Sequence, residues 1–400
     1  MRAAQVRILS ASLLLDIGGF VAIALVGAFA VQITRELHIS TTDIGIAATV
    51  FFLFGGLAAA VTGPEIDRFG WYRGAAAGSV LSLAALLSMA LTVHTSWGLM
   101  AAMAVAGVAS ALSIPSTNVM LFRSMPLNHL GLAISVKQAS IPLALMVAGL
   151  ALPSVALNVG WRWAFAGAAL FPIVGLAITP SRLGTAGTAE PQRRSVSRAA
   201  MRRLWRVGLS VYLAALLPGA LTAYCVVSLV DAGVSNGSAG LIFAAASVAG
   251  IVGRLAAGWR GDRSSATGWR DLAILMVGGG TGAILMASWQ PAVMVGGILL
   301  AFGLGWAWPS LIYLLVVKVE TQNPGSSSSV VQFAGMLGSA FGPAIIGLAI
   351  PAIGLQYSWV IVGGLTILGG LVVLWAGRMR SASVGAEPFS EATIERSASD

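Results

Sequence analysis

The sequence predicts an all-α membrane protein whose twelve transmembrane helices form two parallel repeats of six helices. Of its 400 residues, 57% are hydrophobic and only 9% are charged, whereas soluble domains carry roughly 25% charged residues. Twelve apolar stretches each approach the ~20 residues that cross a bilayer as a helix. Sequence features of the first half also return in the second half at a nearly constant offset.

The apolar stretches fall into two groups of six, separated by a polar segment. In the first half they cover residues 8–31, 42–62, 74–93, 97–122, 131–157 and 161–180. In the second half they cover residues 207–230, 238–259, 272–289, 291–317, 326–350 and 355–377. The intervening segment 181–206 carries seven arginines and has the composition of a solvated, cytoplasmic basic linker. We therefore expect helical bundles over 1–180 and 207–377, followed by a disordered cytoplasmic tail over 378–400.

Positive charge is placed asymmetrically along this predicted topology. If the N-terminus is cytoplasmic, 19 of the 23 Lys and Arg residues lie on the cytoplasmic side, Arg35 and Arg162 lie outside, and Lys137 and Arg254 lie within spans. Cytoplasmic loops of membrane proteins carry this excess. The sequence thus predicts a multi-pass protein of the cytoplasmic membrane with both termini cytoplasmic, and its pI near 10.7 reflects topology rather than nucleic-acid binding. The cytoplasmic arginines can also contact anionic lipid.

Four pairs of matching features support an internal repeat. They are Gly63-x-x-x-Asp67-Arg68 with Gly258-x-x-x-Asp262-Arg263 at an offset of 195, Pro115 with Pro309 and Gln138 with Gln332 at 194, and Trp163 with Trp359 at 196. Many transporters are built from repeated halves in this way.

These features resemble the major facilitator superfamily over nearly the whole chain, from Ile8 to Gly377. The segment from Gly63 to Gly74, which we place in the loop after the second helix, is similar to the G-x-x-x-D-R-x-G signature of that superfamily, matched at Gly63, Asp67, Arg68 and Gly70. The segment departs from the pattern at Trp71 and Tyr72, where further basic residues are usual. The resemblance implies a secondary transporter with two six-helix bundles, and a gating role for this signature and for its echo at Gly258, Asp262 and Arg263.

The two acidic residues of the repeated signature have a physical role available to them. Asp67 would face the positive N-terminus of the helix that starts near 326, and Asp262 would face the helix that starts near 131. Such contacts between the halves can hold the cytoplasmic side shut and break during alternating access. The alternative is a solvated loop carboxylate.

Three charged residues lie within the predicted spans, where a charge costs ~2.5–3.5 kcal/mol and usually has a function. They are Asp16, Lys137 and Arg254. Side chains lean toward the N-terminus of their helix, so Arg254 leans toward the bilayer midplane and both Asp16 and Lys137 lean toward the cytoplasm. Lys137 is then either a second substrate ligand or the partner of Asp16. Asp16 is either a proton carrier or a member of a permanent ion pair.

Two cations against one acid favour a small organic anion as substrate, most simply a monocarboxylate, bound by Arg254 through its planar guanidinium. The monocarboxylate and oxalate/formate branches of the superfamily are similar in placing an arginine on the eighth helix. The alternative is a structural role for Arg254 between the halves. Further polar residues on the spans either contact substrate or join helices. These residues are Asn118, Gln138, Tyr224, Tyr313 and Gln332.

The sequence therefore predicts a monomeric secondary transporter of a small organic anion that works by alternating access, either coupled to protons or not. The alternative function is proton-driven efflux of an uncharged or cationic compound, with Asp16 as the substrate or proton acid. An enzyme is not expected, and neither are catalytic residues, a cofactor or a metal. The Gly233-Val-Ser-Asn-Gly237 segment lies in a short outer loop rather than on a strand-to-helix turn, and the three histidines have no metal-binding spacing.

Overall fold

The computed structural model describes residues 3–125, 133, 136–180, 198–263, 268–319 and 324–384, and these residues include no β-strand. The first half contains α1 (Ala3–Ala28), α2 (Ala30–Leu37), α3 (Thr41–Phe69), α4 (Trp71–Leu91), α5 (Ser96–Ser124), α7 (Ser140–Ala151), the π-helical turn η1 (Leu152–Ala156), α8 (Trp161–Ala168) and α9 (Leu170–Ile178). The second half contains α10 (Arg198–Asp231), α11 (Asn236–Arg263), α12 (Trp269–Met286), α13 (Pro291–Gly303), α14 (Trp308–Val319) and α15 (Pro324–Val384).

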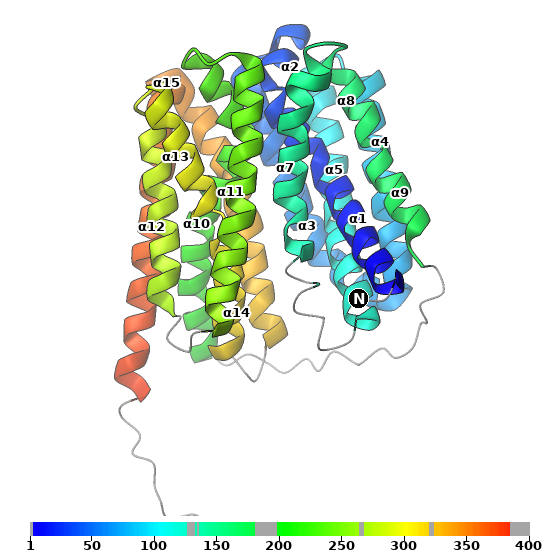
Figure 1. Cartoon of the computed structure of the whole chain (residues 1–400). Helices are drawn as coiled ribbons and strands as arrows, with labels where there is room; N and C mark the ends of the chain where they lie inside the picture. The colour runs from blue at the N-terminus through cyan, green and yellow to red at the C-terminus, as the bar shows by residue number, and fades with distance from the viewer. Residues whose placement is uncertain are drawn as a thin grey trace, which may run out of the picture.

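Over the described residues, 10 helical segments are long and apolar enough to cross a membrane. The last of them, Val331–Trp375, is 45 residues long and contains a break at Gly354, where φ is 77°. It therefore holds two spans. α12 is not among the 10 segments, but it is 18 residues long, packs against α13 and α15, and stands in the place of the ninth predicted helix. The chain is a multi-pass membrane protein with two six-helix bundles (Figure 1).

Several helices extend beyond their predicted boundaries. α10 begins at Arg198 rather than at 207, and α15 ends at Val384 rather than at 377, so parts of the predicted linker and tail are helical. α3 continues to Phe69, which makes the predicted signature loop helical up to Gly70. Gly70 has φ 91° and is the residue that ends α3. Hydropathy locates the apolar part of a helix, whereas polar helical turns at its ends continue until a residue such as glycine breaks them.

The repeat is visible in the backbone and corrects one of the predicted pairs. Gly160 and Gly354 both have positive φ, at 103° and 77°, and both precede the last span of their half. This offset of 194 aligns Trp359 with Phe165, and both side chains are fully buried. Trp163, which we paired with Trp359 from the sequence, is 67% exposed. The predicted pairing of Trp163 with Trp359 was therefore two residues out of register.

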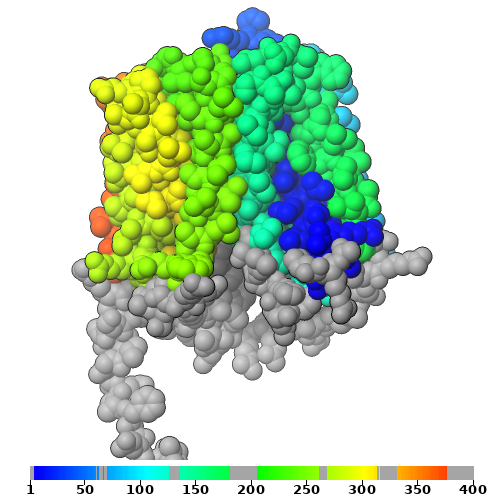
Figure 2. Space-filling view, in the orientation of Figure 1, coloured from blue at the N-terminus to red at the C-terminus, as the bar shows by residue number. Residues whose placement is uncertain are grey.

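The long helices alternate in direction, so each bundle has two distinct ends (Figure 1). We call the end at which α1 starts and α5 and α11 finish the basic end, because it holds Arg7, Arg123 and Arg260, and we call the other the opposite end. Glycines allow the two halves to approach closely toward the opposite end. A Cβ added at Gly149 of α7 would lie 2.6 Å from the Gly240 carbonyl oxygen of α11, and one added at Gly240 would lie 2.7 Å from the Gly149 carbonyl oxygen. In Figure 2 the surfaces of α7 and α11 meet in the upper part of the view.

Polar contacts between the halves also gather toward the opposite end. The Gln32 side chain donates to the Asn236 side chain at 3.2 Å. On α3, the Thr42 and Thr49 hydroxyls donate to the carbonyls of Gly347 and Ala340 on α15, at 3.2 and 2.9 Å. These contacts join the two bundles on the side away from the chain's N-terminus.

Candidate functional site

A buried ion pair joins α1 to the segment that precedes α7. Lys137 Nζ lies 2.9 Å from Asp16 Oδ2, and each side chain is only 3% exposed. The Thr117 hydroxyl donates to Asp16 Oδ1 at 2.7 Å, and Lys137 also donates to the Ile114 carbonyl at 3.3 Å. Of the two roles that the sequence left open for Lys137, the structure shows the pairing with Asp16.

α5 supplies the acceptor and donor that complete this pair. Pro115 lies inside α5 and has no backbone N–H, so the helical bond to the Ala111 carbonyl is missing, and that carbonyl accepts from the Thr62 hydroxyl at 3.1 Å. The Ile114 carbonyl, one residue before this proline, is turned to the Lys137 ammonium, and Thr117 follows two residues later. A buried charge needs both a counter-ion and hydrogen bonds, and α5 provides the latter on both sides.

Arg254 connects the two halves of the molecule. Its Nε donates to the Trp306 carbonyl at 2.9 Å, its Nη1 donates to the Gln138 carbonyl at 2.8 Å, and its guanidinium carbon lies 5.6 Å from the centre of the Trp306 ring. Trp306 belongs to the second half, whereas Gln138 belongs to the first. The arginine is half-buried, so it stands at the seam between the bundles and contacts both.

The Asp16 to Lys137 ion pair and the contact made by Arg254 involve two consecutive residues, Lys137 and Gln138. Lys137 reaches into the first bundle toward α1, while the carbonyl of Gln138 is bound by α11 of the second bundle. Residues 136–138 form a short helical turn that ends at Ala139, immediately before α7. A movement of α11 relative to α7 would therefore act on the residue next to Lys137.

The other predicted substrate-contacting residues occupy different surroundings. Asn118 is half-buried beside Thr117, and the side chains of Gln138 and Gln332 are exposed. Tyr224 is fully buried on α10, with its hydroxyl against Gly45 of α3 and near Gly347 of α15. In this conformation Tyr224 is part of the contact between the halves rather than of the seam at Arg254. The side chain of Tyr313 lies outside the described residues.

The gating residues are described only in part. Gly63, Asp67 and Arg68 lie within α3, and Gly258, Asp262 and Arg263 lie within α11. Gly70 separates α3 from α4. The side chains of both aspartates and both arginines lie outside the described residues, so the latch between the halves stays a prediction. Of the residues that the structure describes, none form a group of three or more His, Cys, Asp or Glu that could hold a metal ion.

The sequence analysis missed a polar cluster at the opposite end. Glu36 of α2 accepts from the Trp161 indole at 2.5 Å and from Arg162 Nε at 3.0 Å. Arg162 also donates to the carbonyls of Met89 and Val93 at 3.2 and 2.8 Å, at the end of α4. These contacts tie α2, α4 and α8 together. Residues 125 positions apart carry no periodic signal, so only the fold reveals the pairing.

Comparison with known proteins agrees with this architecture. No curated protein matches the sequence. Two solved structures of a bacterial homologue of the human lysosomal transporter Spinster are similar in fold, both in inward-facing conformations. The occupied form aligns with a TM-score of 0.72 and 15% identity, and the unoccupied form with 0.75 and 14%; each alignment covers 94% of this chain and 98% of the other.

The sequence profile of the Major Facilitator Superfamily matches residues 10–263 and again residues 221–396. The two matches overlap over residues 221–263 and together cover nearly the whole chain. The chain is therefore a transporter rather than an enzyme, and it belongs to the major facilitator superfamily.

Proposed function

We propose that this transporter moves a small organic anion, most simply a monocarboxylate, across the cytoplasmic membrane by alternating access. The observation that carries the proposal is the position of Arg254 between the two halves. Its guanidinium donates to the Trp306 carbonyl of the second half and to the Gln138 carbonyl of the first half. A substrate that is passed between two rocking bundles must be held where both can reach it. Arg254 is a charged residue in such a place.

The charges within the spans favour an anion. Asp16 and Lys137 form an ion pair within the first bundle, whereas Arg254 is the cation of the three that stands at the seam between the halves. A carboxylate can accept two parallel hydrogen bonds from a guanidinium and is a stronger acceptor than a peptide carbonyl. An arriving carboxylate could therefore take the place of the Gln138 carbonyl and loosen the contact between α11 and α7.

Proton coupling through Asp16 is proposed on the same geometry. The Lys137 ammonium is the counter-ion of Asp16 while the pair is intact. If movement of residue 138 separates Lys137 from Asp16, a carboxylate left buried without its counter-ion favours uptake of a proton. Protonation would then follow the conformational cycle, because Lys137 and Gln138 are adjacent in the chain.

The conformation is proposed to be open toward the cytoplasm. Besides the bond from Arg254 to the Gln138 carbonyl, the halves are joined by Gln32, Thr42, Thr49 and the Gly149 to Gly240 contact, which lie toward the opposite end. The excess of positive charge at the basic end supports a cytoplasmic location of that end and of both termini. We propose that one chain forms the complete pathway, with Asn118, Gln138, Tyr224, Tyr313 and Gln332 available to substrate during the cycle and the Asp67 and Asp262 segments acting as gates.

Efflux of an uncharged or cationic compound is the second candidate. The observation in its favour is that Arg254 donates to two backbone carbonyls, as a residue with a purely structural role between helices would. In that case Asp16 would carry the proton or bind the compound, and Arg254 would keep the halves in register.

The test is uptake of radiolabelled small carboxylates by liposomes that contain the purified protein, with and without an inward proton gradient. Arg254→Ala is expected to lower uptake by at least about tenfold, because charge-assisted hydrogen bonds contribute about 1.5–3 kcal/mol. Arg260→Ala is the matched control, since it removes the same charge from the same helix at an exposed site paired with Asp271. Equal uptake by the wild type and Arg254→Ala would refute the ligand role of Arg254.

Asp16→Asn tests the coupling in the same liposomes. We expect it to abolish stimulation by the proton gradient while exchange of internal for external substrate continues. Gradient-driven accumulation by this variant would show that Asp16 does not carry the proton. If the folded wild type takes up no carboxylate at all, the efflux function replaces the anion proposal.

A further inference from the structure

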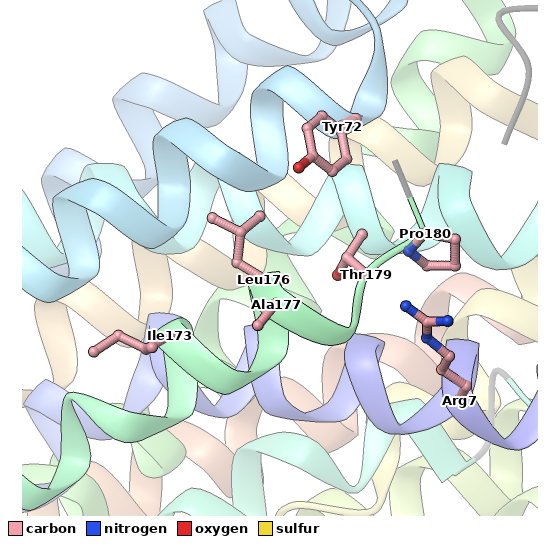
Figure 3. Close-up of a pocket in the computed structure, with 7 residues that line it drawn as sticks. All are labelled: Arg7, Tyr72, Ile173, Leu176, Ala177, Thr179 and Pro180. Carbon is pink, nitrogen blue, oxygen red and sulfur yellow. The ribbon is translucent and has the colours of Figure 1, made fainter. Parts of the chain in front are cut away.

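A second concave site lies away from the seam, on the outer side of the first bundle at its basic end. It has a volume of about 650 Å³ and is lined by α1, α4, α9 and the residues that follow α9. Figure 3 shows the side chains of Arg7, Tyr72, Ile173 and Leu176 around it. No lining residue belongs to the second half, so this cavity is separate from the place proposed for the transported substrate.

The polar part of the cavity suits a phosphate group. Arg7 Nε donates to the Ile178 carbonyl at 2.8 Å, which ties the guanidinium to the end of α9. Among the described residues this is the polar contact that Arg7 makes, and its terminal nitrogens lie toward Thr179 (Figure 3). A guanidinium held in this way offers two further donors with the geometry that phosphate oxygens accept.

Tyr72 adds a second donor close to a positive helix end. It is the second residue of α4, whose N-terminus has no side-chain cap and carries the positive end of the helix dipole. Its ring is half-buried and edge-on to Trp71 at 5.9 Å. Tyr72 lines the cavity, with its hydroxyl on the side of Leu176 (Figure 3). Thr179 uses its hydroxyl proton on the Gly175 carbonyl and so is available only as an acceptor.

The rest of the wall is apolar and continues along the exposed side of α9. Ile173 and Ala177 line the cavity and are exposed, and Leu170 and Val174 extend the apolar surface with exposed fractions of 61% and 42%. α9 is the end of a membrane span, so this surface faces hydrocarbon chains. A cationic site at the level of the headgroups that opens onto an apolar strip matches a molecule with a phosphate head and an acyl chain.

We infer that this cavity binds the phosphate of an anionic glycerophospholipid through Arg7 and Tyr72, with an acyl chain lying along α9. Free phosphate shares the chemistry of the headgroup but lacks the acyl chain that would cover Ile173 and Ala177. The lipid would join α1, α4 and α9 from outside and stabilise the basic end of the first bundle.

The test compares lipid binding by native mass spectrometry and by thermal unfolding of the full-length protein in detergent. The probes are phosphatidylglycerol, phosphatidylcholine and inorganic phosphate. Phosphatidylglycerol is expected to bind and to raise the unfolding temperature, phosphatidylcholine to do so less, and inorganic phosphate to have no effect. Arg7→Gln should weaken phosphatidylglycerol binding by about tenfold, given the contribution of charge-assisted hydrogen bonds. Arg123→Gln, an exposed arginine at the same end on α5, should bind as the wild type does.

A variant that keeps Arg7 covers the case in which Arg7→Gln does not fold. Ala177→Trp fills the cavity at an exposed position, so it should fold and lose the stabilisation by phosphatidylglycerol. Equal binding of both lipids by the wild type would overturn the inference, as would unchanged phosphatidylglycerol binding by both Arg7→Gln and Ala177→Trp. Stabilisation by inorganic phosphate equal to that by the lipid would show an ion site and not a lipid site.

Discussion

At the scale of single residues, the Asp16 to Lys137 pair is the feature with the largest energetic consequence. Both side chains are 3% exposed and 2.9 Å apart. Removal of one member leaves a buried charge without its counter-ion, which costs about 3–5 kcal/mol, whereas removal of both leaves neutral side chains. The losses of unfolding free energy caused by the two single substitutions should therefore sum to more than the loss caused by the double substitution.

Lys137→Ala is expected to lower the thermal stability of the detergent-solubilised protein markedly, and Asp16→Ala/Lys137→Ala should be more stable than Lys137→Ala alone. Circular dichroism or fluorescence-detected unfolding of the four proteins of this cycle measures the coupling. Additive losses would mean that the two side chains do not interact in the folded protein.

The sequence located the important charges but not all of their partners. Asp16, Lys137 and Arg254 stand out because ionised groups are rare in apolar spans. The direction in which a side chain leans along its helix also placed Asp16 and Lys137 on the same side, where the structure pairs them. Two acceptors of Arg254 are the main-chain carbonyls of Trp306 and Gln138. Every residue has a carbonyl group, so no residue type could have identified them.

At the scale of elements, the crossing of α7 and α11 depends on two glycines that face each other. A side chain at either position would collide with the backbone of the other helix. The helices would have to separate, and contacts between the halves toward the opposite end would be weakened with them. The same collision is absent at Gly296 of α13, where an added Cβ meets nothing within 4 Å.

Cys225 can report this separation, because it is the only cysteine of the chain and is 1% exposed. It lies on α10, one turn from Thr222, whose carbonyl contacts Gly27 of α1 across the halves. Gly149→Leu is expected to raise the rate at which a maleimide modifies Cys225 severalfold, while Gly296→Leu should leave it unchanged. A rate that is equal in all three proteins would show that the crossing does not hold the opposite end closed.

The elements were largely predictable, whereas their ends were not. The spans follow from hydropathy, because the bilayer demands a minimum apolar length; α12, which begins with Trp269, Arg270 and Asp271, is the weakest of them. The continuation of α3 through Asp67 to Phe69 did not follow, because polar residues at the end of a membrane helix are as compatible with a helix as with a loop. The positive φ of Gly70, which ends α3, depends on packing that hydropathy does not contain.

At the scale of the whole molecule, the first bundle is braced at the opposite end by Glu36 and Arg162, which tie α2, α4 and α8. The buried pair of Asp16 and Lys137 ties α1 to the start of α7. Contacts of this kind within a bundle resist deformation, so the bundle is expected to move as a unit when the halves rock. The contacts between bundles are then the ones that change.

The orientation of the whole molecule can be tested with two positions on α5. In a Cys225→Ala background, Trp97→Cys places a thiol at the opposite end, where Trp97 is 80% exposed. Arg123→Cys places one at the exposed basic end of the same helix. A membrane-impermeant maleimide should label only Trp97→Cys in intact cells and only Arg123→Cys in inside-out vesicles. The reverse pattern would place the basic end and both termini outside the cell.

The bond from Arg254 to the Gln138 carbonyl also has an evolutionary consequence. Because the acceptor is main chain, the side chain at position 138 can vary among homologues without loss of the contact. Substitutions at 138 and 254 therefore need not compensate each other, and the two positions should show little correlated variation although they touch. Methods that infer contacts from such correlations would overlook this link between the halves. Selection on the contact should instead appear as conservation of Arg254 alone.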